Sequence, residues 1–127
     1  MGRIHRQSGA ASSPTWAWDD APATEYRSDD APGVIRHVLV GPEDGASDFV
    51  VRYFTVPAGA ATALDRHPHE HGVVVVHGAG RVLLGDEWHD IGQGDSVFIA
   101  GEETHRLEAA PDQPLGFVCV IPSGIPG

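Results

Sequence analysis

The stretch ALDRHPHEHGVVVVHGAG, residues 63–80, places histidines just before and just after four consecutive valines. Valine is stiff about χ1 and is favoured in strands over helices, so the valines predict a β-strand. The closing Gly-x-Gly predicts a tight turn after that strand. On a strand, side chains two residues apart share a face, which nominally places the odd positions from Asp65 to His71 together. The stretch therefore predicts imidazoles laid into a sheet.

A helical metal site is the competing interpretation, because His67 and His71 are four residues apart. The zinc-binding helix motif H-E-x-x-H requires glutamate after its first histidine, and Pro68 stands there instead. The sequence therefore favours the strand.

Strand-forming runs separated by turn residues continue on both sides of this stretch. They occupy residues 34–40, 48–56, 73–76, 81–84, 88–91, 96–100, 105–109 and 115–121. No part of the chain keeps a 3.6-residue apolar period, and 16 glycines and 10 prolines favour turns over long helices. Short strands at hairpin spacing are typical of an all-β sandwich or barrel.

The length of 127 residues is that of one domain. Residues 1–32 mix Ser, Ala, Pro and Asp, so we expect a loosely ordered N-terminal arm before a compact domain at 33–127. Trp16 and Trp18 are the large apolar residues of the arm, and we expect them to dock onto the domain or onto a partner subunit.

Charge and cysteine content limit the kinds of partner and the cellular compartment that we expect. Eighteen acidic residues against 8 Lys plus Arg give a formal charge of −10, which opposes binding to nucleic acid and to anionic membranes. The single cysteine, Cys119, cannot form an intrachain disulfide, and the start of the chain has no apolar run typical of a signal peptide. We expect a cytoplasmic protein that binds a small molecule.

The histidine stretch needs one more ligand from elsewhere to complete a metal site. Iron, manganese, nickel, copper and zinc all accept neutral imidazole, and a site requires three or four converging donors. His67 and His71 supply two, and His105, which opens a later strand-forming run, is the candidate for another. We therefore expect one divalent first-row transition metal, of unspecified identity.

The segments HPHEHGVVVVHGAGRVLLG and IGQGDSVFIAGEETHRLEA resemble the two signature motifs of the cupin superfamily. The second family motif, G-x(5)-P-x-G-x(2)-H-x(3)-N, keeps its spacing here, from Gly94 to His105. Ala100, Glu102 and Ala109 replace its proline, second glycine and asparagine. The resemblance covers residues 50 to about 121.

The resemblance also implies a ligand set. Counting back from the Gly-x-Gly turn, the family's ligands fall on Asp65, His67 and His71, with His105 supplied by the second motif. The pattern is similar to that of four-histidine, quercetinase-like cupins, with Asp65 in place of the leading histidine. Asp65 either binds the metal directly or hydrogen-bonds a ligand imidazole. His69 lies where the family varies, and we expect it at the rim.

Candidates for the pocket wall are Arg52, Phe54, Phe98, Phe117 and Cys119. Parity places Arg52 with Phe54, and Phe117 with Cys119, on single strand faces. Plain core packing is the alternative for the aromatic residues. A buried Arg52 must find an anion, such as a substrate carboxylate or enolate. Cys119 is a candidate catalytic thiol, although a buried cysteine is usually inert.

The resemblance implies a single-domain double-stranded β-helix, the jelly-roll barrel of the cupins, assembled as a homodimer that covers exposed sheet edges. The implied activity is that of a metal-dependent oxidoreductase of the dioxygenase type, acting on a small enol, phenol or diketone. One alternative is a non-redox lyase, isomerase or cyclase in which His69, Glu70 or Glu102 moves a proton. A non-catalytic binding module is the other.

Overall fold

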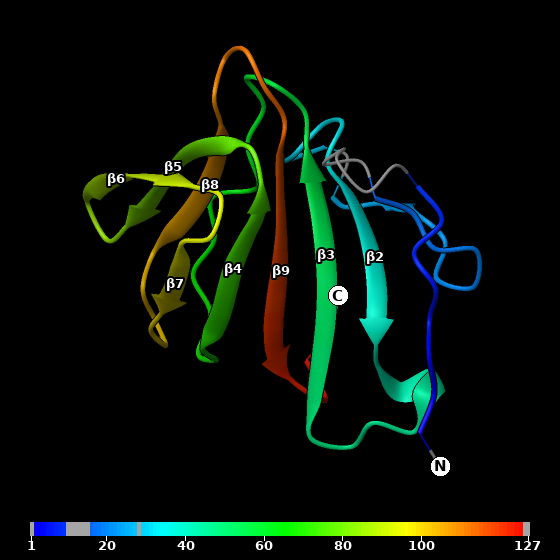
Figure 1. Cartoon of the computed structure of the whole chain (residues 1–127). Helices are drawn as coiled ribbons and strands as arrows, with labels where there is room; N and C mark the ends of the chain where they lie inside the picture. Colours follow the sequence, from blue (N-terminus) through cyan, green and yellow to red (C-terminus); the bar gives the residue numbers. More distant parts are fainter. Residues whose placement is uncertain (1, 10–15, 28, 126–127) are drawn as a thin grey trace.

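The computed structural model describes residues 2–9, 16–27 and 29–125 and consists almost entirely of strands in two sheets (Figure 1). The larger sheet has the strand order β1-β2-β3-β9-β4-β7, and the smaller has the order β6-β5-β8. The strands are β1 Thr24–Glu25, β2 Ile35–Val40, β3 Phe49–Val56, β4 His71–His77, β5 Ala79–Leu84, β6 Glu87–Gly92, β7 Ser96–Ile99, β8 His105–Ala109 and β9 Leu115–Pro122. A short 3₁₀ helix spans Pro42–Asp44.

Every strand-forming run expected from the sequence falls on one of the strands β2 to β9, so the all-β prediction is confirmed. The exception concerns the histidines. β4 begins only at His71, and the residues from Arg66 to Glu70 form an irregular loop. Pro68 has no backbone N–H to give to a ladder, which explains why the strand does not extend back through the loop. The expected strand face from Asp65 to His71 is therefore wrong.

The larger sheet turns one face toward the smaller sheet, and β4 shows how its sequence permits this. His71, Val73 and Val75 are buried, whereas Val74 between them is exposed, as expected for a strand that covers a core on one side. Neighbouring strands contribute the rest of the inner face through their register. Arg52 on β3 pairs with Cys119 on β9, for example.

The Gly-x-Gly turn between β4 and β5 depends on the absence of side chains. Gly78 has a φ of 80°, in the left-handed region that favours glycine. A Cβ on Gly78 would collide with the carbonyl of Pro114, and one on Gly80 with the carbonyl of Glu108. Both glycines thus let the chain pass from the larger sheet to the smaller at close range, which closes the barrel around its core.

The described parts of the N-terminal segment pack against the outer face of the larger sheet. Trp16 stacks on Tyr53 with ring centroids 5.7 Å apart, and Trp18 is 8% exposed. β1 extends the sheet by pairing with β2, so this segment also contributes a strand. No helix among the described residues is long and apolar enough to span a membrane.

Candidate metal centre

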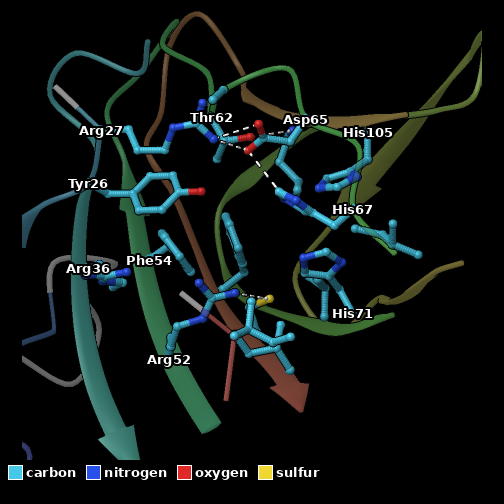
Figure 2. Close-up of a pocket in the computed structure, with 18 of the residues that line it drawn as sticks. Tyr26, Arg27, Arg36, Arg52, Phe54, Thr62, Asp65, His67, His71 and His105 are labelled. Atoms are coloured by element: carbon cyan, nitrogen blue, oxygen red, sulfur yellow. Dashed lines mark hydrogen bonds and ion pairs between the residues drawn. The ribbon is translucent and has the colours of Figure 1, made fainter. Parts of the chain in front are cut away.

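A cavity of about 260 Å³ lies between the two sheets, and side chains from many strands line it (Figure 2). Its residues fall into two groups. The imidazole cluster consists of His67, His69, His71 and His105. The N-terminal wall consists of Tyr26, Arg27, Arg36, Arg52 and Phe54. Apolar side chains of β4, β7, β8 and β9 complete the lining.

The imidazole cluster brings its rings close enough for a single ion. The ligand nitrogens of His67, His69 and His71 all lie within 4.8 Å of one another. The His105 ring centroid lies 4.7 Å from that of His71 and 5.3 Å from that of His67. The structure thus places the three histidines expected from the sequence together. It also places His69 among them, stacked on His67 at 4.7 Å, and not at the rim.

Backbone hydrogen bonds join the loop that carries His67 to the strand that carries His105. Asp65 and His105 exchange both of their backbone hydrogen bonds, at 3.1 and 2.8 Å. The backbone N–H of Glu102 donates to the carbonyl of His67 at 2.5 Å. These contacts explain how imidazoles far apart in sequence meet without a continuous strand between Asp65 and His71.

Two ring nitrogens show that the cluster suits a metal. His105 Nδ1 lies 2.9 Å from the carbonyl oxygen of Glu103. A carbonyl only accepts, so Nδ1 carries the proton and Nε2 keeps a lone pair for an ion. His71 Nδ1 is buried and has no hydrogen-bond partner among the described residues. A buried nitrogen without a partner is costly, and a metal ion would satisfy it.

The electrostatics of His71 agree with this fit. Burial, together with a smaller contribution from the neighbouring His105, lowers the pKa of His71 to about 3. His71 is therefore neutral near pH 7, which is the form that binds metal. The donor set, with several neutral imidazoles, fits any of the first-row ions expected from the sequence.

Asp65 lies beside the cluster and is held from outside it. Both of its carboxylate oxygens accept from Arg27 Nη1 at 2.6 Å, and Arg27 also binds Asp30 at 2.6 Å. Asp65 Oδ2 lies 3.6 Å from His67 Nε2, beyond ordinary hydrogen-bond length (Figure 2). The structure thus places Asp65 between Arg27 and His67. Direct binding of a metal by Asp65 stays a prediction.

Two residues named from the sequence have other surroundings than expected. Glu70 is exposed and does not line the cavity, so its position gives no support to a catalytic role. Phe98 is 62% exposed on β7 and belongs neither to the cavity wall nor to the core. Its parity explains this, because Phe98 pairs with exposed Gly72 while neighbouring Ile99 pairs with buried His71.

Cys119 does line the cavity, but its environment does not favour a nucleophile. Burial raises the pKa of its thiol, so it stays protonated near pH 7. Its Sγ lies 3.3 Å from Arg52 Nη2, which makes it a hydrogen-bond partner of that arginine. Arg52 is 8% exposed and lines the cavity together with Phe54 and Phe117, all three of which were candidates for the pocket wall.

Three residues of the N-terminal wall were not expected from the sequence: Tyr26, Arg27 and Arg36. Tyr26 packs edge-on against Phe54 at 5.0 Å, and its hydroxyl is directed toward the cavity (Figure 2). Arg36 reaches the cavity because β2 pairs it with Phe54. The strand pattern of residues 34–40 placed Arg36 on a strand, but only the register with β3 shows which face it occupies. No periodic pattern marks Tyr26 and Arg27.

Comparison with known proteins identifies the domain. The family model for the cupin domain matches residues 52–121. A curated relative, the 1-methylthio-D-xylulose 5-phosphate methylsulfurylase of Rhodospirillum rubrum, is 37% identical over 71 residues, 56% of this chain and 46% of that protein. An uncharacterized protein of Methanocaldococcus jannaschii is 29% identical over 50% of this chain and 52% of its own. The chain thus spans about half the length of these relatives.

Solved structures extend the likeness over nearly the whole chain. A cupin-2 domain protein from Rhodospirillum rubrum has a TM-score of 0.75 and 30% identity, covering 94% of this chain and 77% of that one. The polyketide cyclase RemF from Streptomyces resistomycificus has a TM-score of 0.79 and 28% identity, covering 96% and 79%.

Proposed function

The chain belongs to the cupin family, and from that premise we propose that it is a metal-dependent enzyme acting on a small oxygen-rich molecule by non-redox chemistry. The observation that carries this proposal is the imidazole cluster at the cavity, in which the donor nitrogens of His67, His69 and His71 lie within 4.8 Å of one another and the His105 ring centroid lies 4.7 Å from that of His71. A divalent ion held there supplies Lewis acidity toward a carbonyl or enolate oxygen.

The chain's own side chains provide the remaining functions of such a site. Phe54 and Phe117 are buried and stack on one another at 5.2 Å, so they exclude water from one side of the cavity. Tyr26 directs its hydroxyl into the cavity, where a phenol can hold or transfer a proton at a substrate oxygen (Figure 2). Arg52 offers positive charge to an oxyanion.

Two relatives support the non-redox class over the dioxygenase class expected from the sequence. One relative is named a methylsulfurylase and another a polyketide cyclase, and neither name describes an oxygenase. A cyclase and an enzyme of a keto-sugar phosphate both act on carbonyl-bearing molecules, which agrees with Lewis-acid chemistry. A fold as widely used as this one does not fix the reaction, so the class has to be tested directly.

The first test is of the metal site. His71→Ala and His105→Ala should each lower the affinity for Zn²⁺ or Co²⁺ by more than about 100-fold, because each removes a ligand and not its support. Arg81→Gln, at a residue outside the cavity lining, is the matched control and should keep the wild-type affinity. Elemental analysis and titration measure this. Full metal occupancy in both histidine variants would overturn the assignment.

The second test separates the reaction classes. We expect the metal-loaded protein to exchange carbon-bound hydrogen next to a carbonyl with deuterium under anaerobic conditions, followed by NMR over a panel of ketones, diketones and keto acids. Dioxygen uptake that matches substrate loss would overturn the non-redox proposal in favour of a dioxygenase. Tight metal binding with neither activity across the panel would overturn the enzymatic proposal in favour of a binding module.

A further inference from the structure

Arg52 is a buried cation whose described contacts include no carboxylate. Its guanidinium donates from Nη2 to Cys119 Sγ at 3.3 Å and lies 4.9 Å from the centroid of the Phe54 ring. Its Nε is buried without a hydrogen-bond partner among the described residues. The side chain therefore has an unused donor, and it lines the cavity with 8% of its surface exposed.

These contacts do not neutralise the charge of Arg52. Burying an unpaired guanidinium costs several kcal/mol unless an anion and hydrogen bonds compensate it. Burial raises the pKa of the Cys119 thiol, which keeps this neighbour neutral near pH 7. The Phe54 ring attracts a cation only weakly. The positive charge of Arg52 thus has no negative partner among its described contacts.

The acidic residues that line the cavity do not supply it. Asp65 gives both carboxylate oxygens to Arg27 at 2.6 Å. Glu25 is exposed on the edge strand β1. Arg36 adds a second positive charge nearby, and burial and the charge of Arg52 both lower its pKa. The balance of charge at this wall therefore favours an anion from outside the chain.

The N-terminal wall faces the imidazole cluster across a gap that a small molecule can span. Arg52 is on β3 and His71 is on β4, with β9 between them in the same sheet (Figure 1). Strands are about 4.8 Å apart, so the two backbones are separated by roughly 10 Å, and both side chains enter one cavity. A ligand of a few carbon atoms can reach from one to the other.

We propose that Arg52 binds the carboxylate of the substrate, and that the substrate is a short keto or hydroxy acid whose reacting oxygen lies at the imidazole cluster. The reacting end rests on the proposed function, whereas the carboxylate subsite stands on Arg52 and its surroundings alone. Nη2 gives one of its two N–H groups to Cys119, so its second N–H, together with the N–H of Nε or of Nη1 on the same edge, remains for a planar carboxylate.

The test uses succinate as the probe, succinamide as its neutral counterpart and inorganic phosphate as the competing anion. Calorimetry measures binding to the protein as purified and again after metal removal with a chelator. Arg52→Gln should weaken succinate binding by about 10–100-fold, since a charge-assisted hydrogen bond contributes on that scale. Arg52→Lys should recover part of the loss, because it keeps the charge without the planar fork. Arg81→Gln is the matched control and should bind like wild type.

A wild-type measurement protects the test against variants that fail to fold. The side-chain Nε–H resonance of Arg52 should shift on addition of succinate and stay in place with succinamide. An unmoved resonance, or equal succinate affinity in folded Arg52→Gln, would overturn the proposal. Phosphate binding tighter than succinate binding and equally dependent on Arg52 would overturn the carboxylate class.

The two proposals fail in different ways in this experiment. Arg52→Gln should retain the wild-type metal content, because Arg52 is not a ligand. Succinate binding that depends on Arg52 in a protein without metal affinity would refute the proposed function and leave the carboxylate subsite standing. Normal metal binding with succinate affinity independent of Arg52 would refute the subsite and leave the proposed function standing.

Discussion

The imidazole cluster and the N-terminal wall enclose the same cavity but are assembled in different ways. Three of the four imidazoles come from five consecutive residues, 67–71, and the fourth is joined to them by backbone hydrogen bonds between Asp65 and His105. The wall instead collects residues from three separate places: the segment at Tyr26 and Arg27, strand β2 and strand β3. The cluster is thus largely a local construction, and the wall is a product of sheet register.

This difference indicates a division of roles. A metal site needs donors at fixed separations of a few ångströms, which a short loop with several histidines provides directly. A substrate wall needs shape and charge over a larger area, which strands in register provide. Apart from Arg27, which contacts Asp65, changes in the wall should therefore alter stability and ligand binding but not metal affinity, and changes near the cluster should alter metal affinity first.

The largest effect on stability should come from the wall. Phe54 is 4% exposed, stacks on Phe117 and receives the edge of Tyr26, so Phe54→Ala should cost about 3–5 kcal/mol of unfolding free energy. Phe98→Ala, in the same larger sheet but exposed, is the matched control and should change stability by less than about 0.5 kcal/mol. Denaturant unfolding measures both. Equal costs would contradict the assigned faces of the sheet.

The contrast also explains what could be predicted from the sequence. Alternation and turn residues fixed the strands, and the histidine spacing with the cupin resemblance located His67, His71 and His105. Parity paired Arg52 with Phe54, and Phe117 with Cys119, on single strand faces, and all four residues line the cavity. The face of a residue such as Arg36 depends on register, which a single strand does not encode.

Other residues could not be predicted because they depend on long-range packing. Tyr26 and Arg27 reach the cavity only after β1 pairs with β2, and residues 24–25 are too short a strand to show a period. Strand parity alone grouped His69 with His67 and His71, and the loop does bring the three together; the rim position expected for His69 came from the family resemblance. Phe98 illustrates the opposite error, since an apolar residue in a strand can face solvent when the strand lies at a sheet edge.

The contact between the wall and the cluster gives a prediction of intermediate size. Arg27 holds Asp65, and Asp65 Oδ2 lies 3.6 Å from His67 Nε2, so the carboxylate supports this imidazole through its charge and not through a direct hydrogen bond. Asp65→Ala should weaken metal binding by about 10–100-fold, the usual effect of a supporting residue. Arg27→Gln should weaken it less, and the double variant should match Asp65→Ala alone, because Arg27 acts through Asp65.

Metal titration of the two single variants and the double variant decides this. Additive losses would show that Arg27 acts on the metal site independently of Asp65. A loss well beyond 100-fold in Asp65→Ala would show that the carboxylate is itself a ligand, and the wall would then extend into the metal site. Either result would mean that the imidazole cluster and the N-terminal wall do not have separate roles.

The smallest effect concerns the turn that leads into β8 on the imidazole side. Glu102 stands where the cupin motif has glycine, and its φ of 65° lies in the left-handed region that costs a residue with a Cβ about 1–2 kcal/mol. Its carbonyl and carboxylate bind Arg66 Nε at 2.8 and 3.2 Å, contacts that are exposed and therefore weak.

Glu102→Gly should raise the free energy of unfolding by up to about 1 kcal/mol, because relief of the backbone strain exceeds the entropy that glycine adds to the unfolded chain. Glu102→Ala is the matched control, since it removes the same carboxylate but keeps the Cβ, and it should be less stable than Glu102→Gly. Thermal and denaturant unfolding of the three proteins measure the difference. If Glu102→Ala is as stable as Glu102→Gly or more stable, the backbone at residue 102 is not strained, and the glycine of the cupin motif has no conformational role at this position.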